Sequence, residues 1–504
     1  MGREDVTDIS SSPAQASPEV TGIGHRMCYT TINNLPQDVF LIIFCMLSRP
    51  QWSRTPTVVS GTTISGWEGI ELDPWPSSDI LNPEHPFPDG LASVCRLWQA
   101  TLSSVSKFWN RLVIWVGRNP TPLSKIRSYL AWSQNRPIKI YIVRRFDMSM
   151  EDPMEKAQVA AVMEELIPHM QRWKILCIKV LHSSSLPLPR VDLVGHADKL
   201  SQLTLDFVVD DSVASDGTAS PLVGELHAPN LSTLFMSGIH FRELFVKPFP
   251  QSLLPPALQY LIISEYDSMR HPPFLLSDLL TCLMSHTWFG SVVLANLDLD
   301  LSYDGPPILP PFSDWCANRV GFVDMSGDVI AQYYQLLRFP WAETVHYVRC
   351  SMDTVEMLGK SYYLKLEEIA NLAALVNFLI NEQGQNPSYR AWFRDCDALC
   401  QPVLSALTQP VGHGVWLCPD LCWLAIEGCK RFQSSDLRMM LEARRDAHAT
   451  IGFADDGHPE YVVTSVKYLD VQNCCELAPE DKEWLDENVN EVCWDDWSGG
   501  CGGW

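Results

Sequence analysis

Basic residues are scarce in this 504-residue chain: 37 Lys and Arg stand against 60 Asp and Glu, a formal net charge of −23. A surface this acidic repels phosphate backbones and anionic lipid, so we expect neither nucleic acid nor a membrane among its partners. The longest apolar run, residues 39–47, is too short to cross a bilayer. The first twenty residues lack a secretory signal, which predicts a cytoplasmic or nuclear protein whose 16 cysteines stay reduced.

Motifs of catalysis and cofactor binding are also missing. No phosphate-binding Gly-x-x-x-x-Gly-Lys, no His-Glu-x-x-His and no Gly-x-Ser-x-Gly occurs. His413, Cys418, Cys422 and Cys429 lie near one another in the sequence, but Cys422 falls inside a strand-like segment and Cys429 follows it. Packing thiols explain these cysteines better than a zinc site does. We expect no cofactor, no metal and no catalytic residue, because the sequence offers no cluster of titratable groups.

Composition divides the chain into four parts. Residues 1–26 hold little to bury and are predicted to be a disordered arm. Residues 27–118 contain two helical patterns separated by a Pro-rich insertion at 48–90, and residues 119–497 alternate short strand-like runs with helical ones. The end, 498–504, is predicted to be a flexible tail. The last 54 residues carry 13 acidic and 2 basic side chains, which indicates a solvated face or, alternatively, steering of a basic partner.

The two helical patterns near the N-terminus are unusually apolar. In the first, Val39, Ile42 or Ile43, and Met46 or Leu47 recur at helical spacing and predict one apolar face, while Phe40, Ile42 and Phe44 add apolar surface off that face. In the second, the helical face is formed by Leu91, Val94, Cys95, Trp98, Leu102 and Val105. Two such short helices cannot stand alone in water, so they pack on a partner or on the rest of the chain as an N-terminal subdomain.

The order of these residues resembles the F-box, over about 40 aligned residues within 32–112. The matching positions are Leu35-Pro36, Asp38-Val39, Ile43-Phe44, Leu47, Val94-Cys95-x-x-Trp98 and Trp109. The chain departs from the family at 48–90, where F-boxes usually have a short turn. Long insertions at this point are similar to those of divergent F-box proteins abundant in mushroom-forming fungi.

The resemblance implies a function without bond-making chemistry. F-box proteins dock on a Skp-family adaptor and, through it, on a cullin–RING ubiquitin ligase, to which they recruit a target protein. The implied adaptor-binding residues are Leu35, Pro36, Val39, Ile43, Phe44, Leu47, Val94, Cys95, Trp98 and Trp109. We expect Leu35, Pro36 and Trp98 to contribute most of the binding energy, as apolar and aromatic anchors usually do.

The C-terminal part contains windows of the form L-x-x-L-x-L, in which L is any aliphatic residue. Their middle positions are Ile140, Leu176, Leu203, Leu234, Leu261, Leu297, Val323 and Val348. The steps are close to, and slightly above, the period of leucine-rich repeats. Two late windows, 421–429 and 466–474, end in Cys429 and Cys474, which are predicted to be small apolar plugs after a strand. The register fades between 348 and 421.

The expected fold class is therefore α/β: a small all-α F-box followed by an irregular leucine-rich-repeat solenoid, with parallel strands backed by helices. Segments after residue 128 and near the C-terminus are similar to those of fungal F-box proteins with leucine-rich repeats. The alternative fold is a mixed α/β domain without a true solenoid. The alternative function is a protein-interaction scaffold unconnected with degradation, in which the helical pair caps the repeats.

Overall fold

The computed structural model describes residues 35–47, 87–144, 153–211, 224–248, 253–308, 316–337, 342–352, 361–380, 389–410, 416–453, 459–461 and 463–502. The expected arm at 1–26 and residues 48–86 of the Pro-rich insertion lie outside this part of the chain.

The N-terminal segments are helical, and a long series of strands follows. The helical segments are α1 (Gln37–Leu47), α3 (Asp89–Ala92), α4 (Arg96–Ser103) and the 3₁₀-helix η2 (Ser106–Trp109). The strands of the main sheet are β1 (Arg111–Val116), β2 (Ile138–Arg144), β3 (Trp173–His182), β5 (Gln202–Val209), β7 (Thr233–Ser237), β8 (Tyr260–Tyr266), β9 (Trp288–Leu297), β10 (Cys316–Val323), β11 (Ala342–Val348), β12 (Ser361–Glu367), β13 (Arg390–Arg394), β14 (Trp423–Glu427), β17 (Tyr468–Gln472), β18 (Glu491–Trp494) and β19 (Trp497–Gly499).

Outer elements connect most successive strands. The helices are α5 (Leu123–Trp132), α6 (Glu155–Leu166), η3 (Ile167–Arg172), η4 (Ser183–Ser185), α7 (Gly238–Phe241), η5 (Arg242–Val246), α8 (Leu276–Met284), α9 (Gly327–Leu337), α10 (Leu372–Leu379), α11 (Gln401–Ala406), α12 (Ser434–His448) and α13 (Pro479–Asn488). Two small separate sheets are formed by β4 (Gly195–His196) with β6 (Leu226–His227) and by β15 (Ile451–Phe453) with β16 (Pro459–Tyr461).

One sheet runs through the described part of the chain in sequence order, and its strands are parallel except for the last pair, β18 with β19. The register aligns one buried aliphatic residue of each parallel strand, and we call this row the ladder. Its members are Leu112, Ile140, Leu176, Leu203, Leu234, Leu261, Val292, Val320, Val345, Leu364, Ala391, Leu424, Leu469 and Val492. Each repeat thus buries its apolar side chains against its two neighbours, as in an α/β solenoid.

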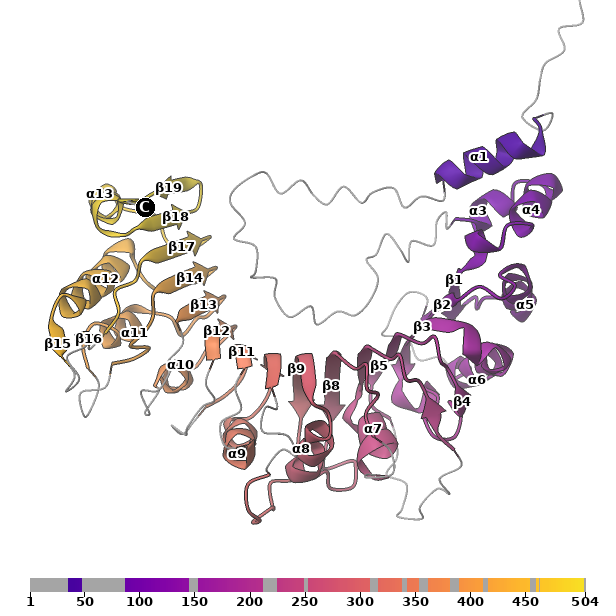
Figure 1. The fold of residues 1–504 in the computed structure, drawn as a ribbon, viewed down its shortest axis with the longest axis horizontal. Coiled ribbons are helices and arrows are strands. Elements are labelled where there is room, and N and C mark those ends of the chain that lie inside the picture. Colours follow the sequence, from indigo (N-terminus) through magenta and orange to yellow (C-terminus); the bar gives the residue numbers. More distant parts are fainter. Residues whose placement is uncertain are drawn as a thin grey trace, which may run out of the picture.

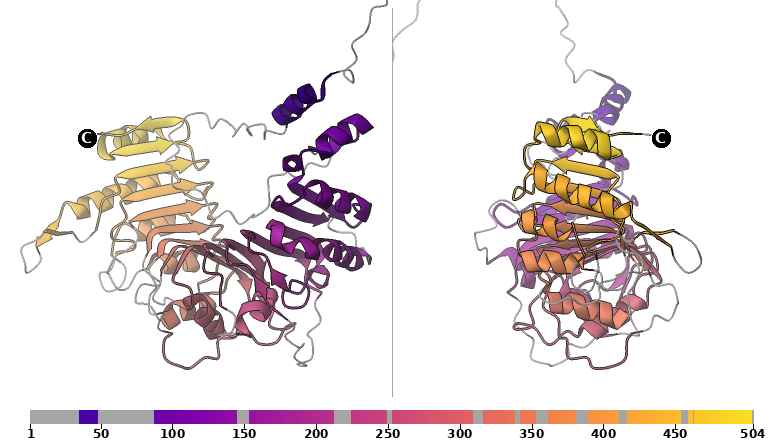
Figure 2. Two further views of the ribbon diagram at one scale, coloured as in Figure 1. Left: turned by 45° about the vertical axis from the view of Figure 1, so that its right-hand side comes forward. Right: turned by 90° about the vertical axis from the view of Figure 1, so that its left-hand side faces the viewer.

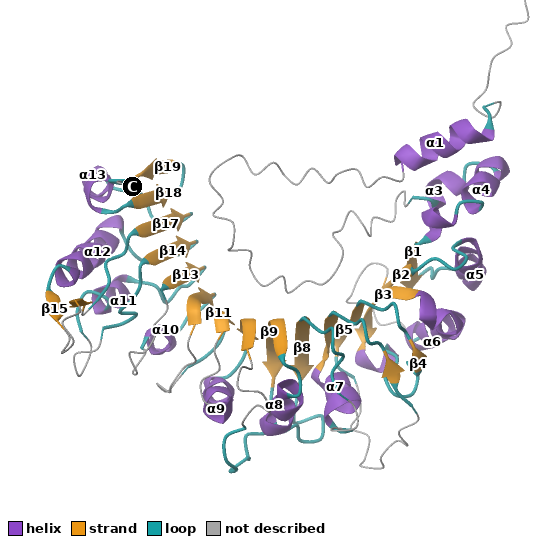
Figure 3. Ribbon diagram, in the orientation of Figure 1, coloured by secondary structure: helices purple, strands orange, loops and turns teal. Residues whose placement is uncertain are grey.

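The sheet bends into an open arc (Figure 1). Strands line the inner side of the arc and helices lie on its outer side (Figure 3). Views from other directions show the strands of the C-terminal arm stacked as successive rungs (Figure 2). Parallel strands are about 4.8 Å apart, whereas a helix with its side chains is about 10 Å wide. Because the outer layer needs more room than the inner one, the stack curves, and α1 and α4 lie at the N-terminal end of the arc.

Eight successive strands, from β8 to β17, end in the same turn. Four residues after the ladder position the backbone takes a positive φ, at Glu265, Asn296, Asp324, Arg349, Glu368, Asp395, Gly428 and Asn473. The turn extends the sheet by one hydrogen bond, as where the Asp395 N–H donates to the Glu427 carbonyl at 2.8 Å. Gly428 suits this turn because its φ of 69° strains a residue with a side chain, and a Cβ there would also require the Asp395 carboxylate to shift.

The residue after this turn points into the core. Cys429 is buried and Cys474 is partly buried at this position, as predicted from the two late windows. Cys350 and Cys396 occupy the same position in two further repeats. Their thiols donate to the preceding strand, Cys350 Sγ to the Phe322 carbonyl at 3.3 Å and Cys396 Sγ to the Leu366 carbonyl at 3.2 Å. A small weak donor is well suited here, since it fills the space and satisfies a carbonyl oxygen.

The structure departs from the sequence-based expectations at four places. Expected middle positions Leu297, Val323 and Val348 lie three to five residues after the true ladder residues Val292, Val320 and Val345. Strands β12 and β13 fill the stretch where the register fades. Residues 498–502, expected to be a flexible tail, are bonded: Ser498 and Gly499 pair with β18, and the Cys501 N–H donates to the Val489 carbonyl at 2.9 Å. The sheet also begins at Arg111, before the expected boundary at 118.

His240 in α7 makes the fold sensitive to acid. Its ring is buried and its Nδ1 lies 2.7 Å from Ser237 Oγ. Burial lowers the pKa of His240 to about 4; Asp210 opposes this shift and His271 adds to it. In the unfolded chain His240 has an ordinary pKa near 6.5 and is protonated below that pH. In the folded chain its imidazole stays neutral until the pH falls to about 4. This group's contribution to stability is therefore complete above pH 6.5 and falls as the pH drops from 6.5 to 4.

We expect the wild-type chain to lose about 2 kcal/mol more stability between pH 7 and pH 5 than the variant His240→Asn, because only the wild type has this buried imidazole. Urea unfolding at the two pH values measures the difference. Equal pH dependence in both proteins would show that His240 is not kept neutral by the fold.

Candidate functional site

The inner side of α1 is packed by aromatic rings. Phe40 and Phe44 are buried, and both rings lie against Trp98 of α4 with centroids 5.9 Å and 5.3 Å away. Both phenylalanines belong to the set expected to add apolar surface off the main face; its third member, Ile42, is exposed. Because Phe40 and Phe44 make the α1–α4 contact, the face predicted from Val39, Ile43 and Leu47 takes no part in that contact.

That predicted face is bare. Met46 is 66% exposed, Ile42 and Leu47 are each 55% exposed, and Val39 is 36% exposed, while Ile43 is half-buried. Large apolar side chains are common on protein surfaces singly, but a helical stripe of them is not. Helix α1 therefore has two apolar sides, and the described part of the chain covers one of them.

The second helical segment adds to the exposed apolar surface. The chain is extended at Cys95, so the segment breaks into α3 and α4 and does not form one continuous helix. Val94 in the break is 60% exposed and Leu97 in α4 is 45% exposed. Cys95 and Trp98 are partly buried. Leu35 is partly buried and Pro36 is exposed at the start of α1, where the Pro36 carbonyl accepts the Val39 N–H at 3.0 Å.

Trp109 joins the helical segments to the solenoid. Its ring is fully buried against Tyr129 and Trp132 of α5, with centroids 4.8 Å and 4.3 Å away, and its Nε1–H donates to the Leu102 carbonyl at 2.9 Å. Phe44 is equally buried. The expectation that Phe44 and Trp109 contact an adaptor is therefore corrected: both side chains are enclosed by this chain and hold α1, α4 and α5 together.

A second candidate surface lies on the inner side of the arc, on β12 to β14. Arg390 is held between aromatic rings, its guanidinium carbon lying 4.0 Å from the Trp423 ring centroid and 4.9 Å from that of Tyr363. Arg390 makes no ion pair with any carboxylate among the described residues, and its Nε has no hydrogen-bond partner there. Its Nε is buried, so only the terminal N–H groups of a guanidinium placed this way can donate to the carboxylate of a partner.

Next to it, three titratable side chains converge from neighbouring strands. Lys365 is buried with its Nζ 5.0 Å from the Trp392 ring centroid, and His346 Nε2 lies 3.0 Å from Glu367 Oε2. Burial lowers the pKa of Lys365 to about 8, with a smaller contribution from Arg319. Burial also lowers the pKa of His346, and the hydrogen bond from His346 lowers that of Glu367. From the sequence we expected no cluster of titratable side chains.

A scan against protein-family models and a search of curated proteins both find no match to this chain. Among the helices that the structure describes, none is long and apolar enough to cross a membrane.

The inner-surface cluster around Lys365 and Arg390 was not predicted from the sequence, because strands β12 and β13 were not predicted either. Its residues belong to β12 and β13, where Tyr, Lys, Arg and Trp alternate with the ladder residues Leu364 and Ala391. The usable signal was alternation itself: polar or aromatic residues at every second position of a five- to seven-residue run indicate a strand with one buried face. Strand register then places residues one position after the ladder side by side.

Proposed function

We propose that this protein is a substrate-recruiting subunit of a cullin–RING ubiquitin ligase, with an F-box at its N-terminus and a leucine-rich-repeat solenoid after it. The observation that carries the proposal is the bare apolar side of α1, continued by Val94 and Leu97. It lies on helices whose sequence order matches the F-box, and it has the composition of a protein–protein interface core.

The adaptor contact uses the exposed and half-exposed members of the predicted set: Leu35, Pro36, Val39, Ile43, Leu47, Val94, Cys95 and Trp98. Ile42, Met46 and Leu97 extend the set, since they are exposed apolar side chains on the same two helices, α1 and α4. Phe44 and Trp109 support the surface from within. Internal packing of one side of α1 helps binding by the other side, because a helix that is already rigid loses little conformational entropy when it binds a partner.

The solenoid holds the target. Its curved inner surface offers Arg390 between Tyr363 and Trp423, which suits an acidic side chain of a bound protein. Aromatic and arginine residues are also the types that carry most binding energy in interfaces. With the adaptor at one end of the arc, a bound target is tethered to the ligase, and its lysines experience a high effective concentration of the ubiquitin-loaded enzyme.

Co-purification of the full chain with a Skp-family adaptor tests the proposal. We expect a stable 1:1 complex on size-exclusion chromatography, and its loss when Leu35 and Pro36 are both replaced by Ala. Circular dichroism of the variant should match that of the wild type. A folded wild-type chain that ignores the adaptor would contradict the proposal and favour the interaction scaffold.

A further inference from the structure

Two successive repeats of the solenoid share a short motif that the adaptor proposal does not use. The sequences His196-Ala197-x-x-Leu200 and His227-Ala228-x-x-Leu231 each come seven residues before a ladder residue. The alanines and leucines are buried, which fixes the backbone of both motifs. The two histidines are the ends of β4 and β6 and pair with each other in a parallel register.

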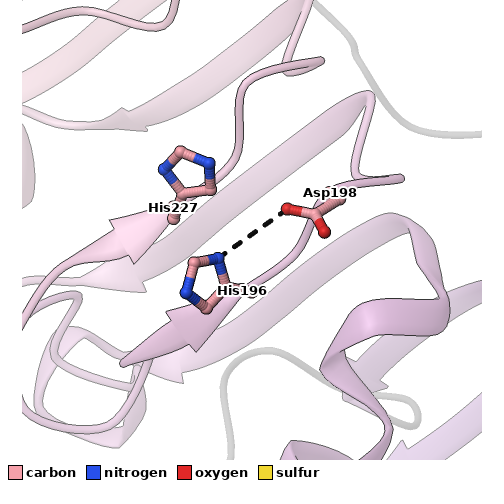
Figure 4. Close-up of side chains that lie close together, drawn as sticks. All are labelled: His196, Asp198 and His227. Carbon is pink, nitrogen blue, oxygen red and sulfur yellow. Dashed lines mark ion pairs between the residues drawn. The ribbon is translucent and has the colours of Figure 1, made fainter.

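The motif places three potential metal ligands together. The imidazole rings of His196 and His227 lie with centroids 4.9 Å apart, and Asp198 lies beside them with its Oδ1 3.9 Å from His196 Nδ1 (Figure 4). One ring nitrogen of each histidine and one carboxylate oxygen all lie within 4.8 Å of one another. All three side chains are exposed, so small rotations can bring the three atoms to a common ion.

We propose that His196, Asp198 and His227 bind a divalent transition-metal ion, with zinc the best match. Two imidazoles and one carboxylate are a ligand set that zinc uses at about 2.0–2.2 Å, whereas magnesium and calcium require oxygen ligands. The set leaves a fourth position open to water or to a side chain of a bound protein. His196 and Asp198 come from one repeat and His227 from the next, so the ion links two repeats.

The surroundings hold the backbone ready but leave the ligand atoms available. The Gly195 N–H donates to the Glu225 carbonyl at 3.0 Å, the Ala197 N–H donates to the His227 carbonyl at 2.8 Å, and Asn230 Nδ2 donates to the Asp198 carbonyl at 2.7 Å. Within the described residues, no hydrogen bond engages either imidazole or the Asp198 carboxylate. The described residues between β3 and β7 form η4, β4 and β6 and contain no long helix, so a metal crosslink would strengthen this part of the arc.

Calorimetric titration of the chelator-stripped full chain with zinc chloride tests the site. We expect one zinc site whose affinity falls by about tenfold or more in His196→Asn and in His227→Asn, since each removes a ligand. His169→Asn is the matched control, because His169 stands at the same repeat position one strand earlier and outside the cluster. Asp198→Asn should weaken binding as well.

Cobalt substitution separates this site from the cysteines. Cobalt held by nitrogen and oxygen ligands lacks the thiolate charge-transfer band that cysteine ligation gives, so its visible spectrum should show only ligand-field bands that disappear in His227→Asn. Equal zinc affinity in the wild type and both histidine variants would overturn the proposal. A cobalt spectrum dominated by thiolate bands would overturn it too.

Discussion

A single aspartate on the bare side of α1 is expected to lower the affinity for the Skp-family adaptor by roughly 30-fold or more, because interface centres exclude water and a buried unpaired charge costs at least about 2 kcal/mol. The variants are Ile42→Asp and Leu47→Asp, both at side chains more than half exposed in the free protein. Because the wild-type side chains make few internal contacts, neither variant should unfold the helices. Calorimetric titration of the adaptor into each variant measures the change.

A matched control comes from the far end of the solenoid. Met439 in α12 is 52% exposed, nearly the same as Ile42 and Leu47, so Met439→Asp introduces the same charge at the same exposure. It should leave adaptor affinity unchanged. If all three variants bind like the wild type, the bare side of α1 is not the adaptor surface.

Trp109→Ala should instead destabilise α4 and α5, since it removes a buried ring from between them.

The role of α1 could be predicted from the sequence only in part, for a physical reason. Both sides of this helix are apolar, so periodicity identifies a helix but cannot say which stripe packs inward. The structure resolves this through Trp98, whose ring fits the phenylalanines Phe40 and Phe44 at one helical turn's spacing. Val39 and Ile43 belong to the other stripe.

Strand positions show a similar limit. Ile140, Leu176, Leu203, Leu234 and Leu261 are correctly predicted as ladder residues. The next three predicted positions lie three to five residues after the true ladder residues. In β9, β10 and β11 the inner face also carries buried apolar residues, of which Val293, Val323 and Val348 form a cluster of their own. Apolar residues on both faces of a strand blur the alternation, so the register is hard to read from the sequence.

The metal cluster needed information of another kind. His196 and His227 are unremarkable as single residues, and only the repeat register brings them together. The shared His-Ala-x-x-Leu pattern was the available signal, and it becomes meaningful once Leu203 and Leu234 are known to be neighbouring ladder residues.

The largest effect on stability is expected at Glu155, the first residue of α6. Its carboxylate is buried, lies 2.5 Å from Arg144 Nη1 at the end of β2, and accepts the Leu181 and His182 N–H groups at the end of β3, at 3.1 Å and 3.2 Å. One side chain thus joins two strands and the helix that connects them. It also lies at the positive end of the helix dipole.

We expect Glu155→Gln to lower the opening free energy of β2, α6 and β3 by about 3 kcal/mol or more, because the substitution removes a buried carboxylate from beside the Arg144 cation and from the N–H groups of β3. Native-state hydrogen exchange measures this locally, and amides of β14 and β17 should be unaffected, since each repeat contacts only its neighbours. Glu165→Gln on the same helix removes the partly buried partner of the exposed Arg127 and should change little, because the pair lies at the surface. Equal effects of the two substitutions would mean that burial contributes nothing to the Arg144–Glu155 pair.

Strand β2 lies beside β1, and α6 also packs near β1. An opening confined to these repeats would therefore loosen the support beneath α4 and weaken adaptor binding without changing the adaptor-binding surface.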